Sequence, residues 1–421
     1  MKKVLQNRFV QQVGTTITSQ SVMLVLSIVS ASITARWLGP AGKGEVAIIL
    51  ATVALFQFVL NAGLAPANVY YAGRKRIPVP FLTENSIVFT LLGAIIGFSV
   101  ILISFLSGFL RTLLPDASPA YLMLGLLLLP IMILNMNLKS ILQGLRKIFV
   151  LNVLNGFQSI LSVFFLSFFI IGLKLGVPGA VLASFMASLL TLLVVVYYIK
   201  QEGASFRPRW RSIVVKPMIS FGIKGYIGNL MQFFNYRLDI FILNYYLGPA
   251  EVGIYGVSVT LAELLWRLPD AVSFVIFPES ANSTQKDMNN FTPRVFQATF
   301  LIIFLGAVAI ALVGQAVIRI VFSDAFISAY TPLLILIPGV FLFGLAKILA
   351  GDIIGRGYPQ YNSITAGLAL IATVILNLLL VPRMGVNGAA LASTLSYCIT
   401  FVSSLVFYFL ISRHPNPLSV K

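Results

Sequence analysis

The chain has 421 residues, of which 58% are hydrophobic and only 10% charged, with a mean hydropathy of +0.96 and a formal net charge of +17. A soluble domain carries about 25% charged residues, so this composition excludes an ordinary soluble protein and predicts an all-α integral membrane protein. The single cysteine, Cys398, and the single histidine, His414, exclude an intrachain disulfide, a thiolate metal site and histidine-based catalysis. We therefore expect no cofactor and no metal.

Long apolar segments predict twelve transmembrane helices, because a bilayer-spanning helix needs about 20 mostly apolar residues. The expected ranges are 12–36, 44–72, 84–110, 119–139, 148–172, 177–200, 215–246, 251–279, 292–321, 327–350, 360–382 and 386–411. No stretch between them is long enough for a sizeable soluble domain.

Lysine and arginine are concentrated in alternate loops, for example in "GRKR" (73–76) and in "RPRWR" (207–211). Cytoplasmic loops carry such an excess, so we expect a multi-pass membrane protein with both termini in the cytoplasm. The bacterial or archaeal cytoplasmic membrane is the location that the family resemblance described below implies. Lys139 and Lys347 are assigned to these cytoplasmic charges. The same rule explains the net charge without nucleic acid as a partner.

Two motifs recur at one offset. "LGPA" begins at Leu38 and again at Leu247, 209 positions later, and "LGVPGAVLAS" at 175–184 resembles "MGVNGAALAS" at 384–393 with the same spacing. This predicts an internal duplication with six spans in each half. Because six is even, the halves are parallel repeats related by a pseudo-twofold axis along the membrane normal.

The predicted boundaries follow from this duplication. They are an N-terminal half at 1–200, a cytoplasmic linker at 201–214 and a C-terminal half at 215–421. Each LGPA is expected to form a tight turn between two helices, with the later glycine allowing close helix packing.

The seventh span carries polar residues at helical spacing along one face. They are Asn229, Gln232, Tyr236 and Asp239. Arg237 is two positions from Asp239 and therefore points elsewhere, toward the eighth span in our interpretation.

The eighth span carries Glu263, Arg267 and Asp270, at i, i+4 and i+7 of a helix and hence along one face. Ionisable groups within a bilayer are unfavourable and usually mark a pathway. We therefore expect Arg237, Asp239 and these three residues to line a central water-filled cavity between the two halves. A structural interpretation stays open, in which Arg237, Glu263 and Arg267 form buried ion pairs between the two spans.

Three stretches carry a family resemblance: "ITARWLGPAGKGEVAII" (33–49), "FFNYRLDIFILNYYLGPAEVGIYGVSVTLAELLWRLPDAVSFVIFPESAN" (233–282) and "GVNGAALASTLSY" (385–397). The chain resembles the polysaccharide transporter family, of the O-antigen or lipid-linked oligosaccharide flippase type. That family belongs to the multidrug, oligosaccharidyl-lipid and polysaccharide exporter superfamily. The resemblance covers essentially the whole chain in span number and repeat layout.

The resemblance implies a flippase that moves a polyprenyl-pyrophosphate-linked oligosaccharide across the membrane by alternating access, for surface polysaccharide assembly. It also implies membrane lipids, a polysaccharide polymerase and other assembly enzymes as partners. Arg36, Arg237 and Arg267 would bind the pyrophosphate, since guanidinium groups form paired hydrogen bonds with phosphate. Asp239 or Glu263 could couple export to H⁺ or Na⁺. A multidrug or cation exporter of the same superfamily is the main alternative. A membrane polymerase or ligase is disfavoured by the short outer loops.

Overall fold

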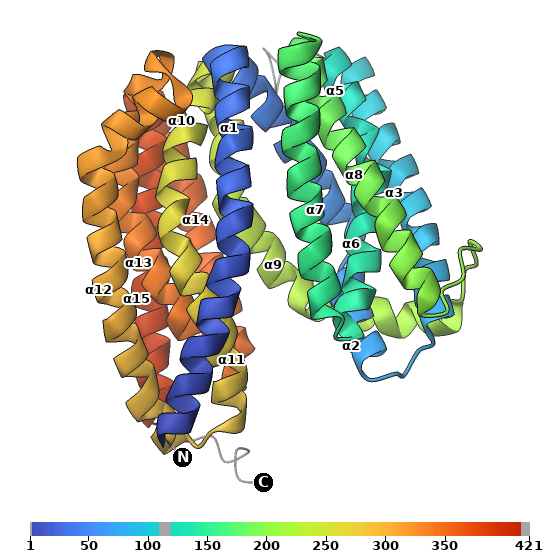
Figure 1. Ribbon diagram of the computed structural model, residues 1–421, viewed down its shortest axis with the longest axis vertical. Helices are drawn as coiled ribbons and strands as arrows, with labels where there is room; N and C mark the ends of the chain where they lie inside the picture. The colour runs from blue at the N-terminus through green and yellow to red at the C-terminus, as the bar shows by residue number, and fades with distance from the viewer. Residues whose placement is uncertain (1, 109–118, 414–421) are drawn as a thin grey trace. The chain divides into compact units, whose positions relative to one another are not determined.

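The computed structural model describes residues 2–108 and 119–413, and every regular element in these ranges is a helix (Figure 1). The first part of the chain forms α1 (Lys2–Asn61), α2 (Leu64–Gly73), α3 (Val79–Leu106), α5 (Pro119–Leu126), α6 (Leu128–Gly144), α7 (Ile148–Leu166), a π-helical segment (Ser167–Gly172) and α8 (Gly176–Gln201). The polytopic α-helical fold is confirmed.

The second part begins with the long helix α9. Its elements are α9 (Ser212–Leu247), α10 (Pro249–Ala262), a 3₁₀ segment (Glu263–Trp266), α11 (Arg267–Asn282), α12 (Gln285–Val317), a π-helical segment (Ile318–Phe322), a 3₁₀ segment (Asp324–Ala329), α13 (Tyr330–Gly355), α14 (Pro359–Met384) and α15 (Val386–Arg413).

Within the described residues, nine helices are long and apolar enough to cross a membrane. The difference from twelve expected spans has identifiable causes. The first two expected spans share α1, which bends at Gly39. α9 has 36 residues and is not among these nine, but its part Val214–Ile223 is a shorter apolar helix. The eighth expected span is divided between α10 and α11. The protein is a multi-pass membrane protein, and the count of twelve stays a prediction.

Both LGPA motifs form the expected turn. Gly39 and Gly248 have φ of 65° and 82°, a left-handed conformation that favours glycine, and the proline that follows each begins the next helical stretch. The second repeated motif behaves in the same way, since Gly176 and Gly385 have φ of 63° and 61°. The sequence repeats therefore correspond to repeated backbone conformations.

The two LGPA turns also pack against each other in a reciprocal manner. A Cβ atom on Gly44 would overlap the carbonyl group of Pro249, and a Cβ atom on Gly253 would overlap that of Pro40. Gly44 and Gly253 are equivalent positions of the repeat, as are Pro40 and Pro249. The later glycine of each motif thus permits the close approach that the sequence predicts.

The chain divides into two compact units. The N-terminal unit comprises Met23–Leu230 and Leu247–Gly253, and the C-terminal unit comprises Met1–Val22, Met231–Tyr246 and Ile254–Lys421. Leu138, Ile141, Leu154 and Val195 are buried together in the N-terminal unit, where α6, α7 and α8 pack. The predicted halves are defined by the sequence repeat, and they stay a prediction.

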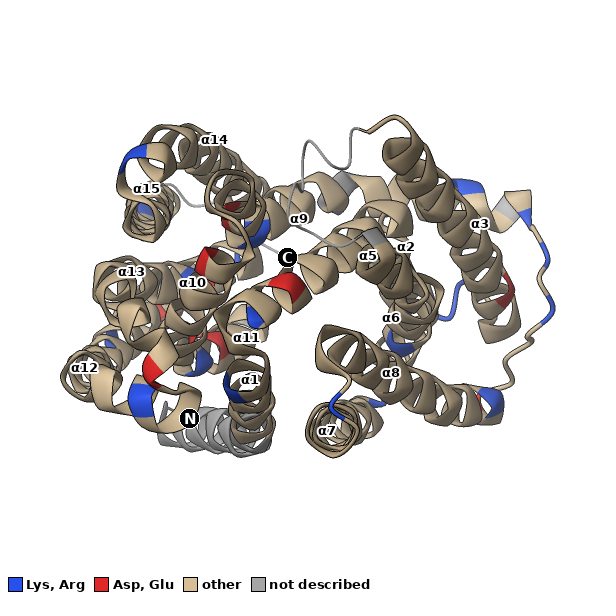
Figure 2. Ribbon diagram, turned by 90° about the horizontal axis from the view of Figure 1, so that it is seen from above, with Lys and Arg blue, Asp and Glu red and all other residues tan. Residues whose placement is uncertain are grey.

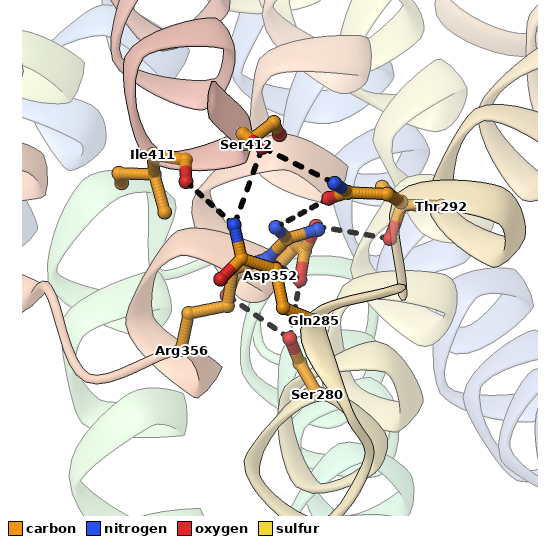
Figure 3. A network of polar contacts seen from close by, with 8 residues as sticks. Ser280, Gln285, Thr292, Asp352, Arg356, Ile411 and Ser412 are labelled. Atoms are coloured by element: carbon orange, nitrogen blue, oxygen red, sulfur yellow. Dashed lines mark hydrogen bonds and ion pairs between the residues drawn. The ribbon is translucent and has the colours of Figure 1, made fainter. Parts of the chain in front are cut away.

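A buried ion pair holds the end of α13 in the C-terminal unit (Figure 3). Arg356 donates from Nε to Oδ1 of Asp352 at 2.9 Å and from Nη2 to Oδ2 at 2.8 Å. The Asp352 side chain is 0% exposed and that of Arg356 7% exposed. Thr292 of α12 and Ser280 of α11 donate hydrogen bonds to the same carboxylate. One carboxylate therefore joins three helices.

The same network reaches α15. Arg356 Nη1 donates to Oδ1 of Asn289 at 2.7 Å, and Asn289 in turn donates to the carbonyl group of Ser412. Gln285 donates to the carbonyl groups of Ile411 and Ser412 at 3.0 and 3.2 Å (Figure 3). These bonds satisfy carbonyl groups in the last turn of α15, which have no partner within the helix.

Candidate functional site

The charged residues of the expected eighth span lie where the helix changes its form. Residues Glu263–Trp266 form a 3₁₀ segment, and α11 begins at Arg267. Pro269 explains this change, because it has no N–H to donate to the carbonyl group of Leu265 and its ring crowds that group. The helix through Glu263, Arg267 and Asp270 is therefore not regular.

Two ion pairs organise this region. Lys347 Nζ of α13 lies 2.7 Å from Oδ1 of Asp270, whereas Arg237 Nη1 of α9 lies 3.9 Å from Oε1 of Glu263. Glu263 is also within electrostatic range of Arg267 and Lys347. Arg237, Glu263, Arg267, Asp270 and Lys347 thus form one charge cluster, which contains three cations and two carboxylates. Most of the rest of the ribbon carries no charge (Figure 2).

Close packing between α11 and α13 sets the position of Lys347. A Cβ atom on Gly351 would overlap Ser273 of α11, and Gly344 faces Pro269. Ser273 donates a hydrogen bond to the carbonyl group of Lys347 at 2.8 Å. Glycines at the interface allow the two helices to approach closely, and this approach brings Lys347 to Asp270.

Aromatic rings surround the lysine. Lys347 Nζ lies 4.2 Å from the ring centroid of Trp266, in a cation–π contact. The Trp266 ring packs against Phe343 at 5.1 Å and Tyr236 at 5.5 Å, and Phe343 packs against Tyr397 at 4.8 Å. The charge cluster is therefore bordered by an aromatic cluster from α9, α13 and α15 and the 3₁₀ segment.

A cavity of about 760 Å³ opens beside these residues, entirely within the C-terminal unit. Helices α9, α11, α13, α14 and α15 supply its walls. Its polar lining is Gln232, Tyr236, Asp270, Ser273, Lys347, Asn362, Thr365, Thr400 and Ser404. Phe274, Phe277, Phe343 and Ile354 are among its apolar lining residues.

The predicted site residues fall into three groups. Gln232, Tyr236 and Asp270 line this cavity, and Arg237, Glu263 and Arg267 belong to the adjoining charge cluster. Asp239 is 6% exposed and lies against Tyr255, which pairs with Ser393 at 3.1 Å. Arg36 and Asn229 belong to the N-terminal unit, and both are exposed.

The ion-pair interpretation of the charges concerns Arg237, Glu263 and Arg267. Arg237 and Glu263 do pair, yet their separation of 3.9 Å is long and the Arg237 side chain is 41% exposed.

Lys347, which forms the closer ion pair with Asp270, is a residue that the sequence prediction assigned to the cytoplasmic charges. That assignment was wrong, because Lys347 lies eight residues before the end of α13 with its side chain 18% exposed. Its position inside the expected span 327–350 was the signal that could have identified it.

A second lysine that was assigned to the cytoplasmic charges also contacts a neighbouring helix. Lys139 lies within α6 of the N-terminal unit and donates to Oε1 of Gln158 at 2.8 Å and to Oδ1 of Asn155 at 3.1 Å. Both amides belong to α7. Lys139 therefore links two helices.

Comparison with protein families gives a match to polysaccharide biosynthesis proteins over residues 33–331. A Shigella flexneri protein described as a candidate O-antigen transporter is 23% identical over 389 residues, which cover 88% of this chain and 91% of that protein. An uncharacterised membrane protein of Methanocaldococcus jannaschii is 25% identical over 282 residues. That match covers 61% of this chain and 55% of the archaeal protein.

Solved structures agree in fold. The lipid II flippase MurJ in an inward closed conformation superposes with a TM-score of 0.78 at 14% identity, covering 94% of this chain and 89% of that one. An inward-facing multidrug resistance transporter of the MATE family gives a TM-score of 0.70 at 17% identity, with 94% and 97% coverage. The chain therefore has the fold that these transporters share.

Proposed function

The chain belongs to the polysaccharide biosynthesis protein family, and we propose that it is a flippase for a polyprenyl-pyrophosphate-linked oligosaccharide. The observation that carries this proposal is the charge cluster beside a cavity of about 760 Å³, in a chain of which only 10% of the residues are charged. The names of the O-antigen transporter and the lipid II flippase support the same substrate class. We propose no enzymatic activity and no cofactor.

The proposed topology has twelve spans in two parallel six-helix repeats, with both termini on the cytoplasmic side of the cytoplasmic membrane. The repeated turns at Gly39 and Gly248 support the repeats, and so do the repeated turns at Gly176 and Gly385. The repeats would rock about a midplane site, so that the substrate is exposed to one side of the membrane at a time. Membrane lipids surround the prenyl tail, and polysaccharide assembly enzymes use the product.

The proposed role of the arginines is to hold the pyrophosphate. Arg237 and Arg267 stay charged in any environment and can each donate two parallel hydrogen bonds to phosphate oxygens. The long Arg237–Glu263 separation supports this role, because the pair can open without loss of a short hydrogen bond. Arg36 would receive the pyrophosphate at the outer side, and Asp239 or Glu263 would couple movement to H⁺ or Na⁺.

Export in cells tests this role. Arg237→Ala and Arg267→Ala should each abolish surface polysaccharide in a strain that depends on this protein, at an unchanged level of protein in the membrane. Arg237→Lys should restore part of the export, because lysine keeps the charge but loses the paired geometry. Alanine variants that are abundant and export normally would disprove the phosphate role. Alanine variants that fail to accumulate would instead indicate a structural ion pair.

The alternative, a multidrug or cation exporter, is favoured by the acidic residues Glu263 and Asp270 of the charge cluster. Asp270 is already paired with Lys347 at 2.7 Å, however, which reduces the negative charge available to a cation. A drug-resistance phenotype without any change in surface polysaccharide would favour this alternative.

A further inference from the structure

The linker after α8 is bound to the first turns of α3, and both belong to the N-terminal unit (Figure 2). The Thr83 hydroxyl group donates to the carbonyl group of Ser205 at 2.9 Å and accepts from the N–H group of Ser205 at 3.2 Å. Arg211 Nε donates to Oε2 of Glu84 at 2.8 Å, and the N–H group of Arg211 donates to Oδ1 of Asn85 at 3.3 Å. Both ends of the segment 205–211 are therefore fixed to the same helix.

The segment between these two anchors presents cations and an aromatic ring to its surroundings. Its exposed side chains, which we call the linker surface, include Arg207, Arg209 and Trp210. The Trp210 ring stacks on that of Phe89 of α3, with the ring centroids 5.7 Å apart and an angle of 23° between the planes. Ring packing as well as hydrogen bonding thus sets the place of the linker surface on α3.

The carboxylates of this region are already engaged by other cations. Glu84 is 4% exposed and pairs with Arg211, and it also lies within electrostatic range of Arg209. Glu202, at the start of the linker, lies 2.7 Å from Nζ of Lys147. One buried carboxylate offsets only one of the guanidinium groups around it. The linker surface therefore keeps a positive charge, which complements an anionic ligand.

An exposed apolar face of α3 begins directly at the linker surface. Phe89, the ring that Trp210 contacts, is followed on the same helical face by Leu92, Ile96 and Ile103, at i+3, i+7 and i+14. These three side chains are 43%, 50% and 64% exposed. Because α3 is long and apolar enough to cross a membrane, we expect this face to contact acyl chains.

We propose that the linker surface binds the headgroup of an acidic phospholipid, whose acyl chains lie along this face of α3. Arg207 and Arg209 would hold the phosphate, since guanidinium groups donate paired hydrogen bonds to phosphate oxygens. An indole ring at headgroup level, as Trp210 would be, is typical of the membrane interface. A free phosphate ion would use the arginines alone and leave the apolar face without a role. This inference goes beyond the proposed function and does not depend on the transported substrate.

The test compares phosphatidylglycerol with phosphatidylcholine of the same acyl chains, which differs in having no net charge. Each lipid is added to the purified full chain in detergent, and native mass spectrometry measures the bound fraction. Wild-type protein should bind phosphatidylglycerol at least about tenfold more tightly, which is about 1.4 kcal/mol. Phosphatidylglycerol should also raise the unfolding temperature, because a ligand of the folded state stabilises it. The double variant Arg207→Gln with Arg209→Gln should lose most of this preference.

The matched control is Lys75→Gln with Arg146→Gln, which removes the same charge from two exposed positions in other loops of the N-terminal unit. It should keep the preference, and without lipid both double variants should unfold like the wild type, because all four side chains are exposed. Equal losses in the two double variants would indicate unspecific attraction to a positive surface and overturn the inference. A wild type that binds both lipids equally would also overturn it.

A third probe, undecaprenyl pyrophosphate, distinguishes an acidic phospholipid from a transported lipid. The double variant at Arg207 and Arg209 should bind this probe as the wild type does. If it instead loses this binding and keeps its preference for phosphatidylglycerol, the linker surface serves the transported lipid and the inference is wrong.

Discussion

At the scale of single residues, the charges of the C-terminal unit differ in how firmly they are held. Asp352 and Arg356 form two short N–O contacts and are almost fully buried, whereas Arg237 and Glu263 are 3.9 Å apart and partly exposed. A firmly held pair fixes helices in place, while a loose pair keeps its donors available for a ligand. Asp352 with Arg356 is therefore expected to be structural, and Arg237 functional.

The structural role of Asp352 gives the first prediction. Asp352→Ala would leave the Arg356 guanidinium buried without its carboxylate, which costs about 3–5 kcal/mol, and would also remove the acceptor of Ser280 and Thr292. We expect a clearly lower unfolding temperature and a lower protein level in the membrane. Thermal unfolding of detergent-purified protein measures the first and immunoblotting the second.

Asp324→Ala is the matched control, because Asp324 pairs with Arg319 at 2.7 Å but both side chains are mostly exposed, at 78% and 63%. Exposed pairs contribute roughly 0–1 kcal/mol, so this variant should unfold close to the wild-type temperature. If Asp352→Ala is no less stable than Asp324→Ala, the network of Figure 3 does not hold α13 as described.

At the scale of elements, the two LGPA turns make a close reciprocal backbone contact. Gly44→Ala would drive a methyl group into the Pro249 carbonyl, and Gly253→Ala would do the same at Pro40. Backbone atoms cannot rotate away as a side chain can, so each variant should lose stability by roughly 1–3 kcal/mol. Gly256→Ala on the same helix, α10, is the control.

A Cβ atom on Gly256 would meet no atom within 4 Å, and alanine is a better helix former than glycine by about 1 kcal/mol. Gly256→Ala should therefore be as stable as the wild type or slightly more so. Thermal unfolding compares the three variants. Equal unfolding temperatures for Gly44→Ala and Gly256→Ala would show that the turns do not pack closely.

The elements also show which parts of the fold can be predicted from the sequence. The LGPA turns followed from glycine and proline chemistry, and most helices from apolar runs of sufficient length. The break between α10 and α11 did not, because a proline inside an apolar run can either bend a helix or convert a turn to 3₁₀ geometry. Lys347 was misassigned because a count of loop charges carries no information on which side chains turn inward.

The sequence predicted a cavity near these charges, but not the position of this cavity within the C-terminal unit. Five helices supply its lining, and contacts between α11 and α13 depend on glycines that are far apart in the sequence. Gln232 and Tyr236 of the polar face of α9 line this cavity. The same face also included Asp239, which is buried against Tyr255 instead. Helical spacing gives a direction for a side chain, but not the neighbour it meets.

At the scale of the whole molecule, the proposed transport by alternating access depends on the topology of the chain. Twelve spans with both termini in the cytoplasm follow from the duplication and from the positive loops at 74–76 and 207–211. A reporter that is active only in the cytoplasm should be active when it is fused after Lys421. The same reporter should also be active when it is inserted in the loop at 203–211. An external signal from only one of the two positions would overturn the parallel arrangement of the repeats, and an external signal from both would overturn the cytoplasmic orientation.

The most direct measurement of the central claim is transport by the protein alone. Proteoliposomes containing the purified protein and a fluorescent undecaprenyl-pyrophosphate-linked oligosaccharide should move the lipid between leaflets, which an impermeant quencher detects. We predict faster loss of protected fluorescence with wild-type protein than with Arg237→Ala, and no difference between Arg237→Ala and protein-free liposomes. Equal rates for wild-type protein and protein-free liposomes, under an imposed H⁺ or Na⁺ gradient as well as without one, would contradict the proposed flippase activity.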